Sequence, residues 1–252
     1  MFTCDLVISY YKENLDWLNE FKNIKFRKII IYTKGHQNPK APLPYIERQL
    51  ENYGRCDQTY LHHIVENYDD LPDVTIFTTG SASLTHKMKQ LKFIVKKVFE
   101  TQDSVFVGSS VRDVKEKLYN FHIDRHRSAN LNNQEYDTNK NVLHKSPLRP
   151  FGRWYTRHFP RVKITMVNYF GVFAVSKKHV LNHTQAYYQK LLAEFPKHSN
   201  PEVGHYFERA WLAVFHPVDG TCLYNDKTGE PRKTRKNKAG VFLLKQGADK
   251  KQ

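Results

Sequence analysis

Residues 201–211, with the sequence PEVGHYFERAW, contain four side chains that could do chemistry. Glu202 and Glu208 are carboxylates that could remove a proton from a hydroxyl group. His205 could contact a metal ion or a phosphate, and Arg209 could bind an anion or keep a glutamate ionised. On a helix with 100° per residue, the four side chains fall within roughly a third of the circumference. They could serve one site, or they could form a solvated face joined by i,i+3 pairs.

Two features of this segment favour the functional interpretation. Gly204 weakens the first helical turn by about 1 kcal/mol relative to alanine, and Pro201 fixes the start of the helix. A glycine at this position suggests that another group approaches the helix backbone closely. Glu202 and Glu208 are about 120° apart on the helix, so we do not expect them to share one role.

Histidine and acidic residues elsewhere offer alternative sites. His122, Asp124 and His126 alternate in FHIDRHR, so an extended strand would turn them to one side. They could bind a divalent metal ion, as in a metal-dependent hydrolase, or form basic surface. The acidic segment ENYDDLPDV, which contains Asp70, could also hold a metal ion, but its sequence is typical of a turn.

Aromatic and basic residues alternate in PFGRWYTRHF. Arg153, Trp154 and Arg157 could stack on a sugar, contact nucleic acid or fold onto the core. A second functional class therefore stays open, a nucleic-acid-binding module that uses this segment and the basic residues 231–238 as phosphate contacts.

The composition narrows the class of protein. The chain has 252 residues, 40% of them hydrophobic, which is enough to bury a substantial core in one domain or two. The net charge of +15 favours polyanionic partners, whether nucleic acid, an anionic membrane or phosphorylated small molecules. Three dispersed cysteines predict free thiols in a reducing compartment. The sequence shows no signal peptide and no apolar run of about 18 residues, so we expect a soluble intracellular protein.

Strand-like and helix-like segments alternate along the chain. Apolar, β-branched runs predict strands, and apolar residues at helical spacing predict the helices between them. This order predicts an α/β fold with a single Rossmann-like, largely parallel sheet flanked by helices. The expected strands are CDLVISYY, RKIIIYTKG, LPDVTIFTTGS, SVFVGSS and NYFGVFAVS, and the expected helices are ENLDWLNEF, DQTYLHHIVENY, His86–Phe99, KKHVLNHTQAYYQKLLAEF and NPEVGHYFERAWLAVF.

Two regions depart from this alternation. The polar, asparagine-rich stretch of residues 111–165 predicts an irregular insertion of loops and short helices over the ligand-binding end of the sheet. Beyond Pro217 the chain turns into hairpin-like residues and the basic sequence DKTGEPRKTRKNKAG. We therefore predict an α/β domain over residues 1–220 and a basic C-terminal tail over residues 221–252.

The sequence resembles a known family, the domain-of-unknown-function family 3431, from about Leu6 to Phe215. That family is similar to glycosyltransferases of the A-type nucleotide-sugar fold. The resemblance implies a mixed α/β sheet and transfer of a sugar from a nucleotide-sugar donor to a hydroxyl of a glycan or other acceptor. The segments that carry it are LVISYYKENLDWL, IIIYTKG, TYLHHIVENYDDLPDVTIFTTG, PFGRWYTRHF, FAVSKKHVL and GHYFERAW.

The same resemblance assigns residues to the nucleotide. Tyr10, Lys12 and Lys34 would lie near it, and the two lysines follow expected strands, at the edge where open α/β sheets bind ligands. Each lysine could balance a diphosphate or simply face solvent. Gly80 and Ser81 would lie near the usual Asp-x-Asp metal site of that fold, and their loop could hold a phosphate through backbone N–H groups.

The resemblance also implies a base and leaves a question about metal. Glu202 or Glu208 would deprotonate the acceptor. The loop FTTGSAS has no carboxylate where the fold usually keeps its Asp-x-Asp motif. A manganese or magnesium ion would therefore be held by other groups such as Asp70 or His205, or the leaving diphosphate would be stabilised by lysine and arginine without a metal.

Overall fold

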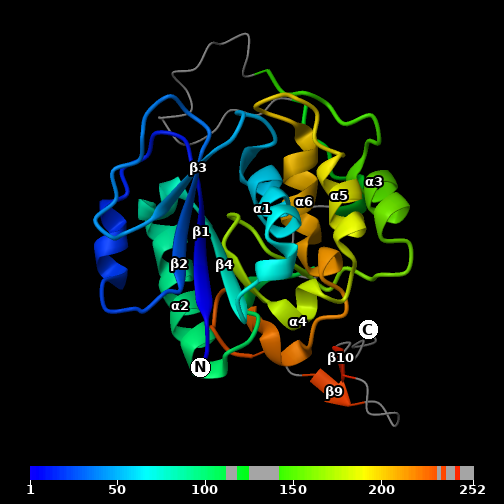
Figure 1. Ribbon diagram of the computed structural model, residues 1–252. Helices are drawn as coiled ribbons and strands as arrows, with labels where there is room; N and C mark the ends of the chain where they lie inside the picture. Colours follow the sequence, from blue (N-terminus) through cyan, green and yellow to red (C-terminus); the bar gives the residue numbers. More distant parts are fainter. Residues whose placement is uncertain (112–117, 125–141, 232–233, 237–241, 245–252) are drawn as a thin grey trace.

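The fold is built around a five-stranded sheet with strand order β3-β2-β1-β4-β7 (Figure 1). The structure, a computed structural model, describes residues 1–111, 118–124, 142–231, 234–236 and 242–244. Four strands are parallel and β7 pairs antiparallel with β4, which confirms the predicted Rossmann-like α/β class. The strands are β1 (Cys4–Tyr10), β2 (Lys28–Thr33), β3 (Ile46–Gln49), β4 (Val74–Thr79) and β7 (Phe173–Ser176).

A second, three-stranded sheet with the order β6-β5-β8 lies beside the first. A single bridge between Val105 and Ala174 connects the start of β5 to β7. SVFVGSS therefore forms a strand as expected, but in this second sheet. Because β8 is buried and pairs with β5, the α/β fold continues past residue 220. The strands are β5 (Phe106–Ser110), β6 (Met166–Val167) and β8 (Leu223–Asn225), and a separate hairpin follows from β9 (Thr234–Lys236) and β10 (Phe242–Leu244).

Helices cover both faces of the main sheet (Figure 1). Side chains alternate across β1, so that Leu6 and Ile8 pack with α2 whereas Val7 packs with α1 and α6. Two hydrophobic cores result, one on each face. The helices on the first face are η1 (Asp16–Phe21) and α2 (Thr85–Thr101), and those on the second are α1 (Arg55–Glu66), α3 (Phe151–His158), α5 (Gln185–Leu192) and α6 (Glu202–Val214).

Helix α6 is the most enclosed helix of the second face. Its aromatic side chains Phe207 and Trp211 are fully buried, and the Trp211 ring stacks on Phe215 with the centroids 5.8 Å apart. Burying an aromatic side chain of this size contributes about 1.5–3 kcal/mol. The helix is therefore fixed in position along its length, which in turn fixes its polar side chains.

Three local elements differ from the sequence prediction. The segment ENLDWLNEF forms a 3-10 helix, and the expected long helix after β7 divides into α4 (Lys177–Val180) and α5. Asn182 fixes the turn between these two helices, because its side-chain amide donates to the backbone oxygens of Phe215 and Pro217. The short edge strand β3 was not predicted. The remaining short helices are η2 (Tyr68–Asp70), η3 (Gly80–Ser83), η4 (Leu118–Asn120) and η6 (Gly220–Cys222).

Across the described part of the chain, no helix has both the length and the apolar character that crossing a membrane requires.

Candidate functional site

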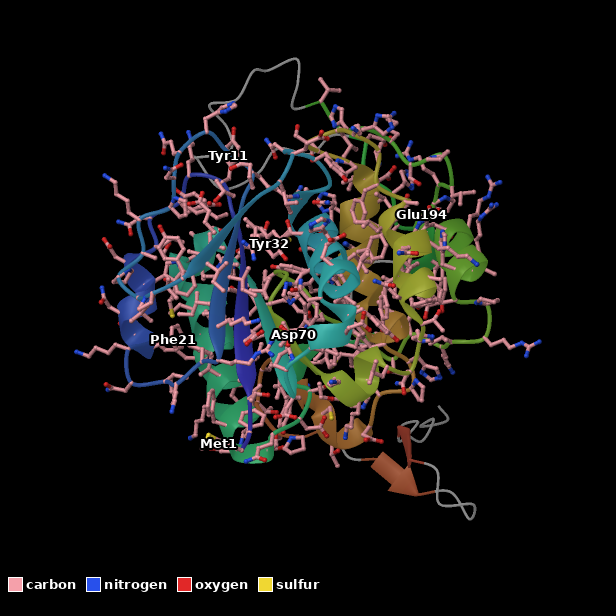
Figure 2. The ribbon with its side chains drawn as sticks, in the orientation of Figure 1. Met1, Tyr11, Phe21, Tyr32, Asp70 and Glu194 are labelled. Carbon is pink, nitrogen blue, oxygen red and sulfur yellow. The ribbon has the colours of Figure 1, made fainter. Side chains whose placement is uncertain are left out.

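Six titratable side chains meet near the carboxyl ends of the parallel strands. Figure 2 labels Tyr11 at this end of β1, whereas Met1 marks the opposite end. The N-terminus of α1 and the first turns of α6 come together there, next to the loop that follows β4. We call the group the carboxyl-edge cluster; it consists of Arg55, Asp57, Lys87, His205, Glu208 and Arg209.

His205 lies between a cation and a carboxylate. Its Nε2 atom is 3.1 Å from the guanidinium of Arg55, which can only donate, so Nε2 accepts this hydrogen bond. The proton is then on Nδ1, which lies 3.7 Å from the Glu208 carboxylate. Burial and the neighbouring Arg55 charge lower the pKa of His205, so the imidazole is neutral at pH 7. Both ring nitrogens therefore face protein groups.

Asp57 and Glu208 form a carboxylate pair with opposite pKa shifts. Burial and the charge of Glu208 raise the pKa of Asp57 to about 7. Burial also opposes ionisation of Glu208, but the hydrogen bond from His205 and the charges of Arg55 and Arg209 outweigh it and lower the pKa of Glu208. Asp57 is fully enclosed, whereas 25% of the Glu208 side chain is exposed. The accessible member of the pair is thus the ionised one.

Asp57 is held in place by two donors. The indole nitrogen of Trp211 donates to its Oδ1 at 3.0 Å, and the thiol of Cys56 donates to its Oδ2 at 3.7 Å. The bond from Trp211 ties the start of α1 to α6.

The cations of the cluster are also fixed by defined contacts. The Arg209 guanidinium lies 3.4 Å from the centroid of the Phe121 ring and donates to the backbone oxygen of His205. Lys87, from α2, donates to the hydroxyls of Thr79 and Ser81 at 3.0 and 2.9 Å. The cations of the cluster therefore come from three helices, and Lys87 is the one that contacts the loop after β4.

Gly204 has the close neighbours that its position suggested. A Cβ atom there would lie 3.3 Å from Cδ of Arg55 and 3.5 Å from Oδ2 of Asp57. The absence of a side chain lets the start of α1 approach α6, which brings Arg55 to His205.

Glu202 is structurally separate from the cluster. It is fully buried and accepts hydrogen bonds from the backbone N–H groups of Ile123 and Ser146, at 3.0 and 2.9 Å. The guanidinium of Arg149 lies 2.9 Å from the same carboxylate. Glu202 therefore connects the start of α6 to two parts of the insertion, and the two glutamates of α6 have different surroundings, as their angular separation predicted.

Lys34 lies at the carboxyl edge, but its ammonium group is hydrogen-bonded to other groups of the protein. Its ammonium group donates to the backbone oxygens of Tyr53 and Arg55 and to the side chain of Gln58, at 2.6–2.7 Å. Burial lowers its pKa to about 7. All three ammonium protons have acceptors, so in this arrangement Lys34 positions the start of α1.

The other predicted nucleotide contacts lie on the same edge. Tyr10 ends β1 and is buried in the core on the α2 side. The backbone N–H of Lys12 donates to the Glu13 carboxylate. That carboxylate also lies against Gly80, where a Cβ atom would come within 2.6 Å of it. The Ser81 hydroxyl bonds to Thr79 and Lys87, so Lys12, Gly80 and Ser81 stay close to the cluster.

Two predicted site residues are placed elsewhere, and these assignments need correction. Asp70 pairs with Arg27 and Lys28 before and at the start of β2, so the length of that strand separates it from His205, and the two cannot share a metal ion (Figure 2). Trp154 is fully buried against Phe207 because α3 packs on α6 through its apolar face. It cannot stack on a sugar in this position.

The residues of the alternative functions are only partly described. His122 and Asp124 lie 3.9 Å apart and are mostly exposed, and Arg149 pairs with Asp124. His126 and residues 232–233 and 237–238 lie outside the described residues. The segment around Asp70 forms η2, in agreement with the predicted turn.

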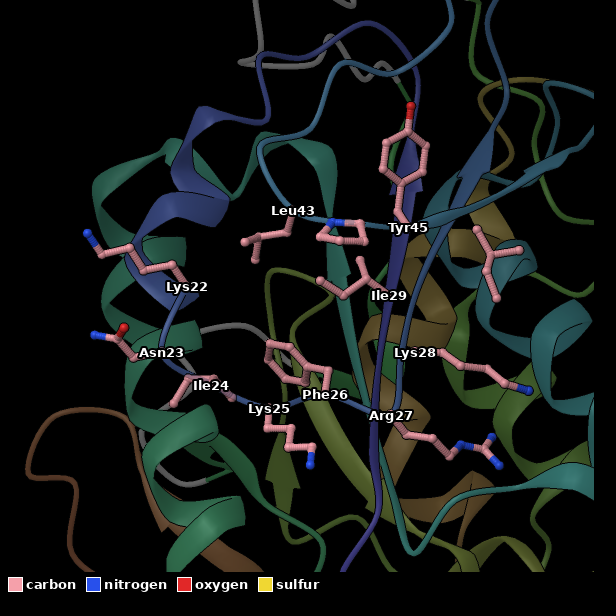
Figure 3. Close-up of a pocket in the computed structure, with 12 residues that line it drawn as sticks. Lys22, Asn23, Ile24, Lys25, Phe26, Arg27, Lys28, Ile29, Leu43 and Tyr45 are labelled. Atoms are coloured by element: carbon pink, nitrogen blue, oxygen red, sulfur yellow. The ribbon is translucent and has the colours of Figure 1, made fainter.

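A surface cavity of about 550 Å³ lies away from the cluster, beside β2 and the segment that leads into β3 (Figure 3). Its lining combines basic and apolar side chains, among them Lys22, Lys25, Phe26, Leu43 and Tyr45.

Four members of this part of the fold were not identified from the sequence: Glu13, Arg55, Asp57 and Lys87. A signal for two of them is present, because Arg55 and Asp57 follow Gly54 at the start of a helix that packs on the sheet. Loops and helix starts at the carboxyl edge of an α/β sheet commonly hold the ligand. The position of Lys87 carries a similar signal, since it lies in the first turn of α2, soon after the end of β4.

The fold and the cluster define an α/β protein with a charged site at the carboxyl edge of its sheet. Residues 6–229 match the family described as "Protein of unknown function (DUF3431)", and the chain belongs to that family. A comparison with curated proteins finds no match.

Proposed function

We propose that the protein is a glycosyltransferase that moves a sugar from a nucleotide-sugar donor to a hydroxyl group of a glycan or other acceptor. The observation that carries this proposal is the carboxyl-edge cluster, in which the ionised, partly exposed Glu208 stands among Arg55, Lys87 and Arg209. The mixed Rossmann-like sheet supports it, because such sheets bind nucleotides at this edge.

The reaction needs a base and a counter-charge. The acceptor oxygen forms a bond to the anomeric carbon, the bond from that carbon to the phosphate oxygen breaks, and the nucleoside diphosphate leaves. In our proposal Glu208 takes the proton of the acceptor hydroxyl. Arg55 and Lys87 meet the charge that develops on the diphosphate.

His205 is a positioning residue in this scheme. Its neutral ring accepts a hydrogen bond from Arg55 and directs its Nδ1 proton toward Glu208, so it fixes the position of the cation relative to the base. The pKa of Asp57 is raised to about 7, so its carboxyl group is protonated below that pH. Protonation of Asp57 limits the negative charge next to Glu208. Of the two glutamates that the sequence proposed as the base, the geometry favours Glu208.

The first test is binding. Isothermal titration of the full chain with a panel of nucleoside diphosphates and nucleotide sugars, with and without manganese, should find at least one ligand with micromolar affinity. Arg55→Met should weaken that affinity at least about tenfold, because one charged contact to phosphate is worth 1.5–3 kcal/mol. If no member of the panel binds, the proposal is wrong.

The second test separates binding from chemistry. Glu208→Gln should keep nucleotide affinity within about threefold while it lowers the rate of sugar transfer or donor hydrolysis by about 100-fold or more. Glu20→Gln is the matched control, because Glu20 is exposed and pairs with Lys92 on another part of the surface. Unchanged turnover in Glu208→Gln would exclude this residue as the base.

A further inference from the structure

A second group of polar side chains lies at the opposite, amino edge of the sheet. Asp103, His179 and Cys222 each present a potential metal-ligand atom, and these atoms all lie within 4.8 Å of one another. In the described part of the chain, this is the one group of three histidine, cysteine or acidic residues with such a spacing. The three residues come from separate segments: the connection between α2 and β5, helix α4 and η6.

His179 has the surroundings of a metal-binding histidine. Its Nδ1 atom lies 2.7 Å from the hydroxyl of Ser104 and 2.9 Å from that of Ser176, and these contacts orient the ring. The Asp103 carboxylate is 3.7 Å from the same nitrogen. Its Nε2 atom points toward the Asp219 carboxylate at 3.8 Å. Metal-binding histidines commonly use one nitrogen for the ion and the other for a hydrogen bond that fixes the ring.

A cation already occupies the space between the two carboxylates. The ammonium group of Lys178 lies 2.5 Å from Asp103 and 3.5 Å from Asp219. More than half of the Lys178 side chain is exposed, so it can swing into solvent without losing buried contacts. The site is therefore arranged for positive charge, and it is open to solvent on the side of Lys178 and Asp219.

We propose that Asp103, His179 and Cys222 bind a zinc ion, with Asp219 or a water molecule as the fourth ligand. One thiolate, one imidazole and one carboxylate are the ligand types that zinc takes in proteins. Zinc–ligand bonds of about 2.0–2.3 Å place one sulfur, one nitrogen and one oxygen atom roughly 3.3–3.6 Å apart in a tetrahedral site. Contraction by about 1–1.5 Å from the limit of 4.8 Å, which side-chain rotation can supply, is therefore enough.

Binding has a chemical and a structural consequence. Burial raises the pKa of Cys222 to about 12, so the metal must displace the thiol proton to solvent when the sulfur–zinc bond forms. The ion then links the connection between α2 and β5, helix α4 and the segment before β8. It would fix the C-terminal segment that supplies β8 to the second sheet.

The test uses the full chain, stripped of metal with a chelator and titrated with zinc and, separately, with cobalt. The wild type should bind one zinc ion tightly, and the cobalt form should show the absorption band of a thiolate bound to cobalt. Cys222→Ser should lower zinc affinity at least about 100-fold and remove the band. Cys4→Ser is the matched control, because Cys4 is also buried but lies in β1, and it should keep both properties.

Three results would overturn the proposal: no stoichiometric zinc binding by the wild type, a bound cobalt ion without a thiolate band, or equal zinc affinity in Cys222→Ser. The cobalt spectrum of the wild type does not depend on whether a variant folds. Histidine sites elsewhere in the chain would bind zinc without that spectral signature.

Discussion

Replacement of Glu202 by glutamine tests whether this carboxylate of α6 stabilises the fold, in contrast to Glu208, the proposed base on the same helix. The buried carboxylate accepts from two backbone N–H groups and from Arg149, at 2.9–3.0 Å. Glutamine keeps one oxygen, so one backbone donor faces an amide N–H₂ group and Arg149 loses its charged partner. Because Arg149 is partly exposed, we place the loss near the lower end of the range for a broken buried pair, about 3 kcal/mol.

The matched variant is Glu208→Gln. The Glu208 carboxylate is partly exposed and lies 3.7 Å from Nδ1 of His205, so its neutralisation should change the unfolding free energy by less than about 1 kcal/mol. Urea unfolding at pH 7, followed by tryptophan fluorescence, measures both values, and similar m-values would confirm a common unfolding reaction. Equal stability of the two variants would refute the assignment of Glu202 as a structural anchor.

Three further predictions follow from the same contacts. Gly204→Ala should leave the unfolding free energy within about 1 kcal/mol, because helix propensity offsets crowding, yet it should weaken nucleotide binding in a titration by displacing Arg55; unchanged binding would contradict the close approach. The raised pKa of Asp57 stabilises the fold at acidic pH, and this contribution is lost as pH rises through about 7. The unfolding free energy of the wild type relative to Asp57→Asn should therefore fall by roughly 1–4 kcal/mol between pH 5 and 8, and a constant difference would contradict the shift. Lys34→Met should cost about 2 kcal/mol or more in urea unfolding, since three acceptors lose their donor; a cost under about 0.5 kcal/mol would show that these bonds do not stabilise the fold.

The parallel strands could be predicted because a strand that is buried on both faces has a continuous run of apolar residues. The run Ile29–Ile31 is apolar throughout, as a strand covered on both faces requires. The edge strand β3 has no such apolar run, since it is half exposed and follows a proline-rich segment. The antiparallel direction of β7 and the second sheet depend on the long connection before them, and strand periodicity carries no information about direction.

Some features of the candidate site could likewise be predicted from the sequence, and others could not. The helical period of α6 correctly separated the angular positions of Glu202 and Glu208, and Gly204 correctly indicated a close neighbour. The burial of Glu202 could not be predicted, because it is produced by the segment around Ser146, distant in the sequence. Asp70 precedes the strand LPDVTIFTTGS in the sequence. That order already puts it at the amino edge of a parallel sheet, so the proposal that it helps to hold a metal ion at the carboxyl edge was wrong on the order of the segments alone.

The most direct test of the central claim is a crystal structure with the tightest-binding nucleoside diphosphate from the titration panel. We predict that its phosphates lie at the carboxyl edge, beside the loop at Gly80, with Arg55 and Lys87 in contact. The side chain of Glu208 should face the open position next to the diphosphate. A nucleotide bound elsewhere, for example in the cavity beside β2, would contradict the assignment of the carboxyl-edge cluster as the active site.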